Sequence, residues 1–433
     1  MKPARPRALN AGVAPREAWS WAMLDFANSG YTTVVLTAVF SAYFVGVVAG
    51  GAPWAALAWT ATLSVSYLLV MFTLPALGAR ADARARKRWL LFAASLGCIV
   101  GTLVLTRVGP GDLWLAIVAV VFSNYCYSVS DSAIASFLPE LAAPKALGRV
   151  SGWGWAMGYF GGLLSLGVAL AIVLAGESHG EGAPVTVPRV MFATAALFAI
   201  AVIPAMLWLR ERAKPSTIPV VSPLRTLARA WREIGQGFRQ FRLLLLCGAS
   251  YQAGISVVIT LAAVYAEQVM GFTMTQTITL IFAVNIAGAF GALVFGSVQD
   301  RIGHRPALAL TLVGWLFTAV TAFLAVDVRV FWVAACLAGL CMGTSQSAGR
   351  AMVGALAPSD RLASFYALWT FAMQLAAAAG PLAYGLVTWL TSGNQRLAML
   401  LTGLFFIAAL GVLSRIRFSQ GEQERKAAEA HAV

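Results

Sequence analysis

The sequence predicts an all-α integral membrane protein whose twelve transmembrane helices form two pseudo-symmetric six-helix bundles. Of its 433 residues 60% are apolar and only 11% are charged, and the mean hydropathy is +0.78. A soluble domain carries roughly a quarter charged residues. Twelve apolar runs have the length of about 20 residues that a helix needs to cross ~30 Å of hydrocarbon, whereas a barrel would show alternating ten-residue strands.

A charged segment that occurs twice indicates that the two halves repeat each other. Gly78 matches Gly296 and Asp82 matches Asp300, both at an offset of 218 residues. Basic residues follow each aspartate, and they include Arg86, Arg301 and Arg305. We expect a short, water-facing hairpin in each half, with the glycine ending an apolar helix where backbones approach closely. A turn in a soluble protein could imitate either copy alone, but two copies at matching places favour a repeat.

The first predicted bundle covers residues 1–209. Its helices are expected at about residues 19–48, 55–77, 89–106, 113–137, 151–175 and 189–209. The fifth of these contains six glycines, a density that lets helix backbones pack closely inside a membrane.

A polar, basic linker over residues 210–242 separates the bundles. Ser222 and Pro223 are suited to start a helix. Apolar residues then recur at spacings of three and four, at Leu224, Leu227, Trp231, Ile234, Phe238 and Phe241, with arginines between them. This pattern predicts an amphipathic helix that either lies on the inner leaflet or packs on the bundles from the cytosol.

The second predicted bundle covers residues 243–417. Its helices are expected at about residues 243–267, 277–298, 307–325, 330–356, 364–390 and 397–416, followed by a polar tail over residues 418–433. An even number of helices places both termini on the same side of the membrane.

The net charge of +14 reports topology. Of 31 lysines and arginines, only Arg107, Arg189, Arg329 and Arg396 fall on the side opposite the termini. The positive-inside rule therefore makes both termini cytoplasmic and predicts a multi-pass protein of the inner membrane that contacts anionic lipid. No basic-aromatic patch indicates nucleic acid. The first apolar run lacks a convincing cleavage site and is expected to remain as a helix.

No cofactor, metal site or enzymatic centre is predicted. The five cysteines lie within apolar runs and the three histidines are scattered. Neither a nucleophile constellation nor a glycine-rich nucleotide loop is present, so ATP is not the expected energy source.

Three ionisable residues stand well inside predicted helices, namely Asp25, Asp131 and Arg350. Such residues are costly in a membrane and usually face a cavity or a partner. Asp131 and Arg350 are 219 residues apart, the same offset as Pro139 and Pro358, so they occupy equivalent places in the two halves.

Other polar residues share helical faces with these charges. Asn28 accompanies Asp25, Asn124 and Tyr127 accompany Asp131, Gln346 accompanies Arg350, and Gln252 aligns with Asn28 in the repeat. Four helices thus carry a polar face each, and a water-filled central path would give those faces a polar environment.

Our hypothesis is that Arg350 pairs with Asp131 or Asp25 and that the remaining carboxylate exchanges a proton. At 1.5 Å per residue, Asp131 and Arg350 lie ~12 Å and Asp25 ~9 Å from the cytoplasmic helix ends. Alternatively, Asp131 and Arg350 only hold the bundles together, Asp25 only caps backbone groups, and Asn28 is an ordinary interhelical hydrogen bonder.

Several motifs resemble known membrane carriers. The repeated segment resembles the loop signature G-x-x-x-D-R-x-G-R-R of the major facilitator superfamily, although Ala83 and Ala85 replace an arginine and a glycine in the first copy. The stretches at residues 21–29, 137–141, 150–162 and 343–350 resemble the family of the autophagy-related vacuolar amino-acid effluxer. The resemblance implies a major facilitator fold, alternating access between two bundles, and aspartates in the charged segments that help to close the cytoplasmic side.

The expected function is therefore secondary transport of a small polar solute, with export of an amino acid or related metabolite coupled to protons. An alternative is a proton-coupled antiporter or permease for drugs, peptides or cell-wall fragments. A non-transporting membrane sensor or scaffold that keeps this fold is a third hypothesis. The protein is expected to act as a monomer.

Overall fold

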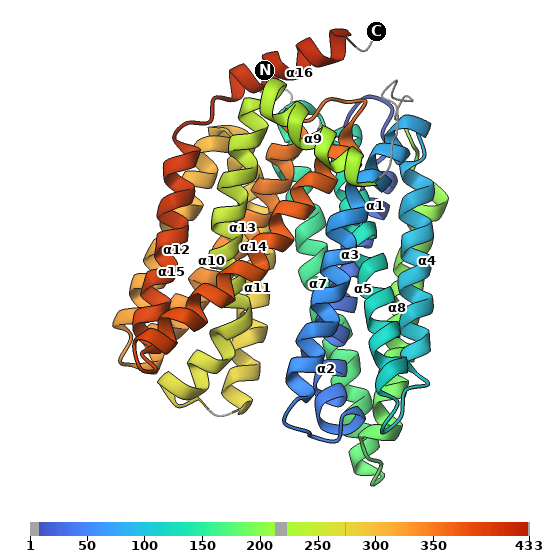
Figure 1. Ribbon diagram of the computed structural model, residues 1–433, viewed down its shortest axis with the longest axis vertical. Helices are drawn as coiled ribbons and strands as arrows, with labels where there is room; N and C mark the ends of the chain where they lie inside the picture. Colours follow the sequence, from blue (N-terminus) through green and yellow to red (C-terminus); the bar gives the residue numbers. More distant parts are fainter. Residues whose placement is uncertain (1–7, 213–222, 273, 432–433) are drawn as a thin grey trace, which may run out of the picture.

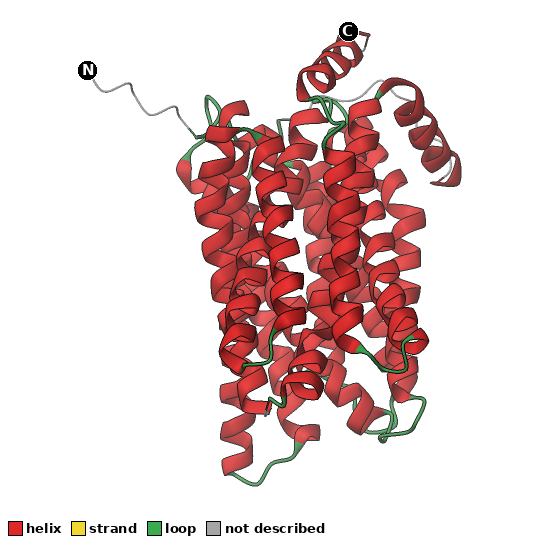
Figure 2. Ribbon diagram, turned by 90° about the vertical axis from the view of Figure 1, so that its left-hand side faces the viewer, coloured by secondary structure: helices red, strands yellow, loops and turns green. Residues whose placement is uncertain are grey.

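The computed structural model describes residues 8–212, 223–272 and 274–431, and the regular secondary structure of these residues is helical except for one isolated bridge between Leu9 and Ala142. Figure 2 shows the helices running nearly parallel with loops only at their ends. Within the described residues, twelve helices are long and apolar enough to cross a membrane. The predicted fold class is thus confirmed.

The first transmembrane helix is not a regular α-helix. It comprises α1 (Pro15–Tyr31), the π-helical stretch η1 (Thr32–Ala38), α2 (Phe40–Tyr43) and a second π-helical stretch η2 (Phe44–Val48). Because α1 begins at Pro15 and not near Trp19, Asp25 lies ten residues, or ~15 Å, inside the helix, deeper than expected.

The other helices follow in chain order, and the two bundles form two lobes in Figure 1, blue to green and yellow to red. The first bundle continues with α3 (Ala55–Arg84), α4 (Lys87–Leu105), α5 (Leu113–Ser136), α6 (Leu138–Leu141), η3 (Pro144–Ala146), α7 (Leu147–Ser178) and α8 (Ala183–Trp208). The linker contains α9 (Pro223–Gly237). The second bundle consists of α10 (Arg239–Met270), α11 (Met274–Ile302), α12 (His304–Leu324), α13 (Val328–Leu356), α14 (Leu362–Leu390) and α15 (Gln395–Leu413), after which α16 (Phe418–His431) follows.

The charged segments are not the water-facing hairpins that we expected. Gly78 and Asp82 lie inside α3, and Gly296 and Asp300 lie inside α11. The chain turns only afterwards, at Ala85 with φ 49° and, in the second half, at Gly303 with φ 92°. Gly78 and Gly296 were expected to end the helices. They instead lie inside helices that continue, at positions where the absence of a side chain permits close packing against the other bundle.

The predicted linker helix packs on the bundles. Trp231 of α9 makes an edge contact with Phe371 of α14, with ring centroids 5.7 Å apart, and Ile234 is buried. Glu233 pairs with Arg361 at 3.4 Å. The sequence left two placements open, on the inner leaflet or packed on the bundles. These contacts show the helix packed on the bundles. The proposed cap at Ser222 lies outside the described residues.

The predicted polar tail is the helix α16. Glu424 accepts a hydrogen bond from the backbone N–H of Gln240 at 3.1 Å, and Glu429 accepts one from Ser359 N at 3.0 Å. Burial of the carboxyl group raises the pKa of Glu424. The helix is therefore anchored to the beginnings of α10 and α14.

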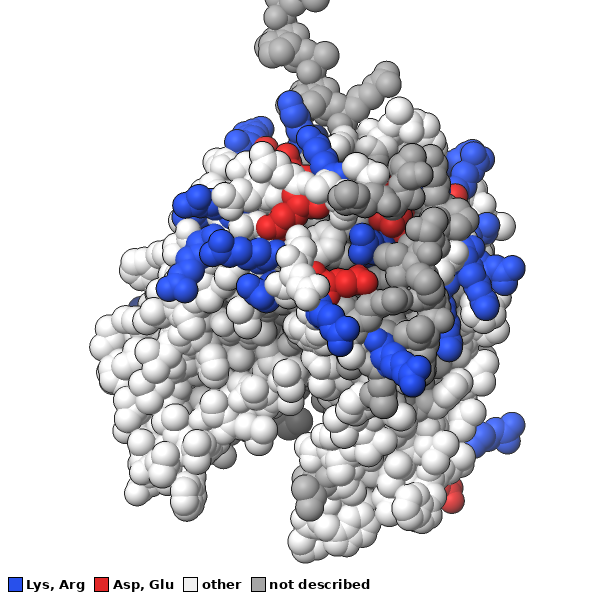
Figure 3. All heavy atoms as spheres, turned by 45° about the horizontal axis from the view of Figure 1, so that its top comes forward, with Lys and Arg blue, Asp and Glu red and all other residues white. Residues whose placement is uncertain are grey.

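The basic side chains gather on one face, which we call the terminal face because α9, α16 and the start of α1 lie there (Figures 1 and 3). The two lobes meet at this face, where α3 packs on α14 and α7 packs on α11. Figure 3 shows the lobes separated by a hollow towards the opposite end. The structure is consequently closed at the terminal face and open at the other.

Candidate functional site

An ion pair between the bundles stands at the centre of the site. Arg350 of α13 donates two hydrogen bonds to Asp25 of α1, from Nη1 to Oδ2 at 2.6 Å and from Nη2 to Oδ1 at 2.8 Å. Both residues are 5% exposed. A buried, bidentate pair of this kind is directional and loses much of its stabilisation if either partner is removed.

Two tryptophans that were not predicted enclose this pair. The guanidinium carbon of Arg350 lies 5.6 Å from the ring centroid of Trp21 and 5.0 Å from that of Trp155. Indole faces attract cations, and they also keep water away from the pair. A Cβ atom at Gly154 would collide with Asp25 Oδ2, so only glycine leaves room for the carboxylate here.

Asp131 is the carboxylate that Arg350 does not bind. It is partly exposed, whereas Asp25 is buried, and among the described residues it forms no ion pair. It does interact electrostatically with Arg350 and Asp25. Asn28 is 3% exposed, and its amide interacts with the carboxyl group of Asp131, although it forms no hydrogen bond of ordinary geometry. The amide of Asn28 therefore retains hydrogen-bonding capacity beside a charged site.

The structure brings other predicted residues together only in part. Gln346 Nε2 donates to Gln252 Oε1 at 3.3 Å, which joins α13 to α10. Tyr127 stacks on Tyr31 with centroids 5.5 Å apart. Asn124 departs from the expectation because it is fully buried. Its amide donates to Ser66 Oγ of α3 at 3.1 Å. Asn124 thus ties two helices of one bundle together and does not line a central path.

At the terminal face, each of the two repeated aspartates caps a helix of the opposite bundle. Asp82 accepts hydrogen bonds from Ala363 N at 3.1 Å and from Ser364 N and Oγ at 2.8 and 2.7 Å, in the first turn of α14. Asp300 accepts them from Gly148 N at 2.9 Å and Arg149 N at 3.1 Å, in the first turn of α7. A carboxylate satisfies the free N–H groups of a helix start and interacts favourably with its dipole.

The glycines predicted with these aspartates lie where the helices touch. A Cβ on Gly78 would be 2.7 Å from the carbonyl oxygen of Ala363, and one on Gly296 would collide with the carbonyl oxygen of Gly148. The predicted basic residues lie elsewhere. Arg86 and Arg301 are exposed, and Arg305 donates to Ser414 O within the second bundle. Of the residues predicted in the charged segments, the glycines and aspartates thus contribute to the contact between the bundles, and these three arginines do not.

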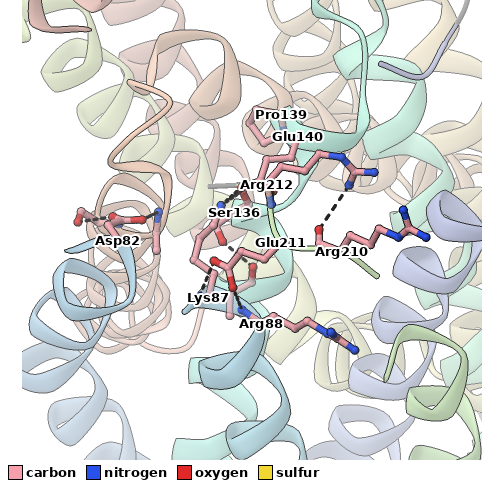
Figure 4. A network of polar contacts seen from close by, with 12 residues as sticks. Asp82, Lys87, Arg88, Ser136, Pro139, Glu140, Arg210, Glu211 and Arg212 are labelled. Carbon is pink, nitrogen blue, oxygen red and sulfur yellow. Dashed lines mark hydrogen bonds and ion pairs between the residues drawn. The ribbon is translucent and has the colours of Figure 1, made fainter. Parts of the chain in front are cut away.

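A second polar network holds the terminal face of the first bundle together (Figure 4). Lys87 is fully buried and pairs with Glu140. Glu211 accepts from Lys87 N at 2.8 Å and Arg88 N at 3.0 Å, which caps α4. The guanidinium of Arg212 donates to Glu17, and this hydrogen bond raises the pKa of Arg212. Since the network joins α1, α4, α6 and the end of α8, this part of the bundle can move as one body.

No bound metal or cofactor is suggested by the residues of the site. Within the described parts of the chain, no group of three or more His, Cys, Asp or Glu side chains could hold a metal ion. What the site offers is a buried ion pair, a free carboxylate and amide groups.

Similarity to solved structures shows the fold. The human organic anion transporter MFSD10 matches with a TM-score of 0.73 at 15% identity, covering 92% of this chain and 100% of that one. The proton:xylose symporter XylE matches with a TM-score of 0.72 at 16% identity, covering 95% and 98%. A bacterial homologue of the iron transporter ferroportin, in an outward-facing state, matches with a TM-score of 0.66 at 17% identity, covering 92% and 100%. The fold is that of a major facilitator superfamily transporter.

The family follows from sequence. Residues 55–426 match the family described as vacuole effluxer Atg22 like, and the chain belongs to this family of transporters, which are not enzymes. An uncharacterized MFS-type transporter, YxiO of Bacillus subtilis, is 25% identical over 399 residues, 90% of this chain and 92% of YxiO. Autophagy-related protein 22-1 of Penicillium rubens is 23% identical over 265 residues, 55% of this chain and 44% of that protein. The protein is thus a secondary transporter with an Atg22-like sequence.

Proposed function

We propose that the protein exports a small polar solute, an amino acid or a related metabolite, across the cell membrane by alternating access coupled to protons. The observation that carries the proposal is the arrangement of Asp25, Arg350 and Asp131. A bidentate ion pair joins the bundles, and a second carboxylate beside it has no cation of its own.

The pair supplies a reason for coupling. In a desolvated site the neutral form of a lone carboxyl is favoured, and a nearby arginine stays charged. Protonated Asp131 would not attract Arg350, which would then pair with Asp25 only. Ionised Asp131 would compete with Asp25 for Arg350. Loss or gain of this proton would then bias the bundles between two arrangements, as a coupled carrier requires.

The polar groups around the pair favour a solute that carries both charge and hydrogen-bonding groups. Asp131 would attract an ammonium group, and the amide of Asn28, which forms no hydrogen bond of ordinary geometry, could take up a carboxylate or hydroxyl group. The amides of Gln252 and Gln346 add donors and acceptors on the side of the second bundle. An α-amino acid meets these demands.

We further propose that the terminal face is cytoplasmic and that the arrangement described is the outward-open state. The gathering of basic residues on this face supports the orientation by the positive-inside rule. The aspartate contacts at the helix starts support closure on that side.

The test is transport into liposomes that contain the purified protein. A thermal-stability screen against amino acids, dipeptides and organic anions first identifies a solute that raises the melting temperature. Counterflow of the radiolabelled solute then measures exchange. A pH-sensitive dye trapped inside the liposomes measures proton movement. We expect saturable counterflow and proton movement that depends on the solute. Stabilisation by a solute without any counterflow would instead identify a sensor, and counterflow without proton movement would refute the coupling.

A further inference from the structure

An apolar groove of about 700 Å³ opens beside the contact between α7 and α11, near the terminal face. Its walls come from residues 8–13, from α1 at Pro15, Ala18, Trp19 and Ala22, and from α7 at Trp153, Ala156, Met157 and Phe160. Leu293 of α11 completes it. The groove thus lies between the bundles, with walls from both.

The groove faces the membrane. Phe160 and Leu293 are 49% and 40% exposed, and both belong to helices that cross the membrane. Trp19 is 49% exposed and lies 6.4 Å from Trp208, ring to ring, as tryptophans do at a membrane surface. In a membrane, these exposed side chains are surrounded by lipid hydrocarbon chains. The occupant of the groove therefore comes from the bilayer.

A positive charge stands at the end of the groove that lies toward the terminal face. Arg149 is on the same stripe of α7 as Trp153, Met157 and Phe160, one helical turn nearer the terminal face. Its Nε has no hydrogen-bond partner, and it forms only a long ion pair with Asp300, with 3.8 Å between Nε and Oδ2. Asp300 already accepts two backbone hydrogen bonds and is therefore a weak competitor for this arginine.

The other charges near this end leave a positive balance. Arg16, next to Pro15 on α1, is exposed and has no ion-pair partner in the described chain. Glu17 is held by Arg212. Arg301 on α11 is exposed. An anionic group at the membrane surface would thus meet Arg16 and Arg301, which have no ion-pair partner in the described chain, and Arg149, whose single ion pair with Asp300 is long.

We propose that an anionic phospholipid of the leaflet at the terminal face binds here, with an acyl chain in the groove and its phosphate against Arg149 and Arg16. Because Leu293 belongs to one bundle and the other walls to the other, the lipid binds across the contact that closes the terminal face. It consequently stabilises the closed arrangement. The inference is independent of the identity of the transported solute.

The experiment compares lipid nanodiscs of phosphatidylcholine with nanodiscs that also contain phosphatidylglycerol. Native mass spectrometry counts the phospholipids that stay bound, and thermal unfolding measures the shift in melting temperature that phosphatidylglycerol causes. Arg149→Gln removes the charge, and Met157→Trp fills the groove without changing charge. Arg84→Gln is the matched control, since Arg84 is an exposed arginine of the same face on α3, which does not line the groove.

We expect the wild type and Arg84→Gln to retain phosphatidylglycerol and to show the shift in melting temperature that it causes. Arg149→Gln and Met157→Trp should lose both the bound phosphatidylglycerol and the shift. Loss in Arg149→Gln but not in Met157→Trp would mean surface attraction without a bound chain and would overturn the proposal. Equal retention of phosphatidylcholine by the wild type would also overturn it, because the site would then ignore the headgroup charge. Should Met157→Trp fold poorly, Met157→Phe makes the same test.

Discussion

Arg350 and Asp25 are separated by 325 residues of chain yet join the two bundles through two hydrogen bonds of 2.6 and 2.8 Å. The pair is buried and enclosed by Trp21 and Trp155. Since one partner belongs to each bundle, any motion that separates the bundles at this level must break the pair or carry it along.

Removal of one partner should therefore be more harmful than removal of both. Arg350→Gln leaves Asp25 buried without a partner and should lower the free energy of unfolding by ~3 to 5 kcal/mol, with transport abolished. Asp25→Asn combined with Arg350→Gln should restore much of the stability but not coupled flux. Asp131→Asn combined with Arg350→Gln should restore less, because Asp131 does not form the bidentate pair. Denaturant unfolding in detergent checks the order, and equal instability of both double variants would contradict it.

Gly154 should be indispensable for the same pair. Gly154→Ala places a methyl group against Asp25 Oδ2, so the carboxylate must leave Arg350, and we expect lower stability and loss of transport. Gly167→Ala on the same helix is the control, since no atom lies within 4 Å of its Cβ. That change should be neutral or stabilise the helix by up to about 1 kcal/mol. A harmless Gly154→Ala variant would show that the pair is not rigidly placed.

Asp131 should couple protons without holding the fold. Asp131→Asn is expected to fold with near wild-type stability, to retain counterflow with a lower affinity for the solute because the ammonium group loses its partner, and to lose accumulation of the solute driven by a pH gradient. Counterflow and gradient-driven uptake in the same liposomes separate the two effects. If the variant still accumulates solute against its gradient in response to pH, another group carries the proton.

The fold could be predicted from sequence because apolar length and the repeat depend on local composition. The partner of Arg350 could not, because residue count placed Asp25 and Asp131 at similar depths, ~9 and ~12 Å. Only the arrangement of α1 and α13, which both pack on α7, decided between them. Gly78 and Gly296 were recognised, but their role was misjudged, since a helix end and a close helix contact both require glycine. Trp21 and Trp155 lie within the stretches that carry the family resemblance, but nothing in the sequence placed them beside Arg350.

The aspartates of the repeat should control the opening of the terminal face. Asp82→Asn and Asp300→Asn each replace a charged acceptor of backbone N–H groups with a neutral one. A hydrogen bond to a charged group contributes roughly 1.5 to 3 kcal/mol to stability. Both variants should express as folded protein and shift the population towards opening at that face. Arg301→Gln, next to Asp300 but exposed, should leave the population unchanged. Accessibility of a cysteine at Ala363, which is 4% exposed, to a thiol reagent added from the terminal side would report the shift, and unaltered labelling in both aspartate variants would contradict this role.

The orientation can be tested by labelling in intact cells with an impermeant thiol reagent. A cysteine at Gly182 should react from outside, and cysteines at Arg84 or Gln420 should be protected. Cys336 is the native cysteine that is only half-buried, so Cys336→Ser is the background. Labelling at Gln420 in intact cells would invert the topology.

Alternating access itself is tested most directly by distances between spin labels on both faces of the reconstituted protein. One pair, at Arg84 of α3 and Ile302 of α11, spans the terminal face, and a second pair, at Trp54 and Gln276, spans the opposite face. The wild type should show mainly a short terminal distance with a long opposite one, and Asp25→Asn should increase the reverse combination. If both distances remain single and unchanged in Asp25→Asn, or lengthen together, the two bundles do not alternate about the Asp25 and Arg350 pair.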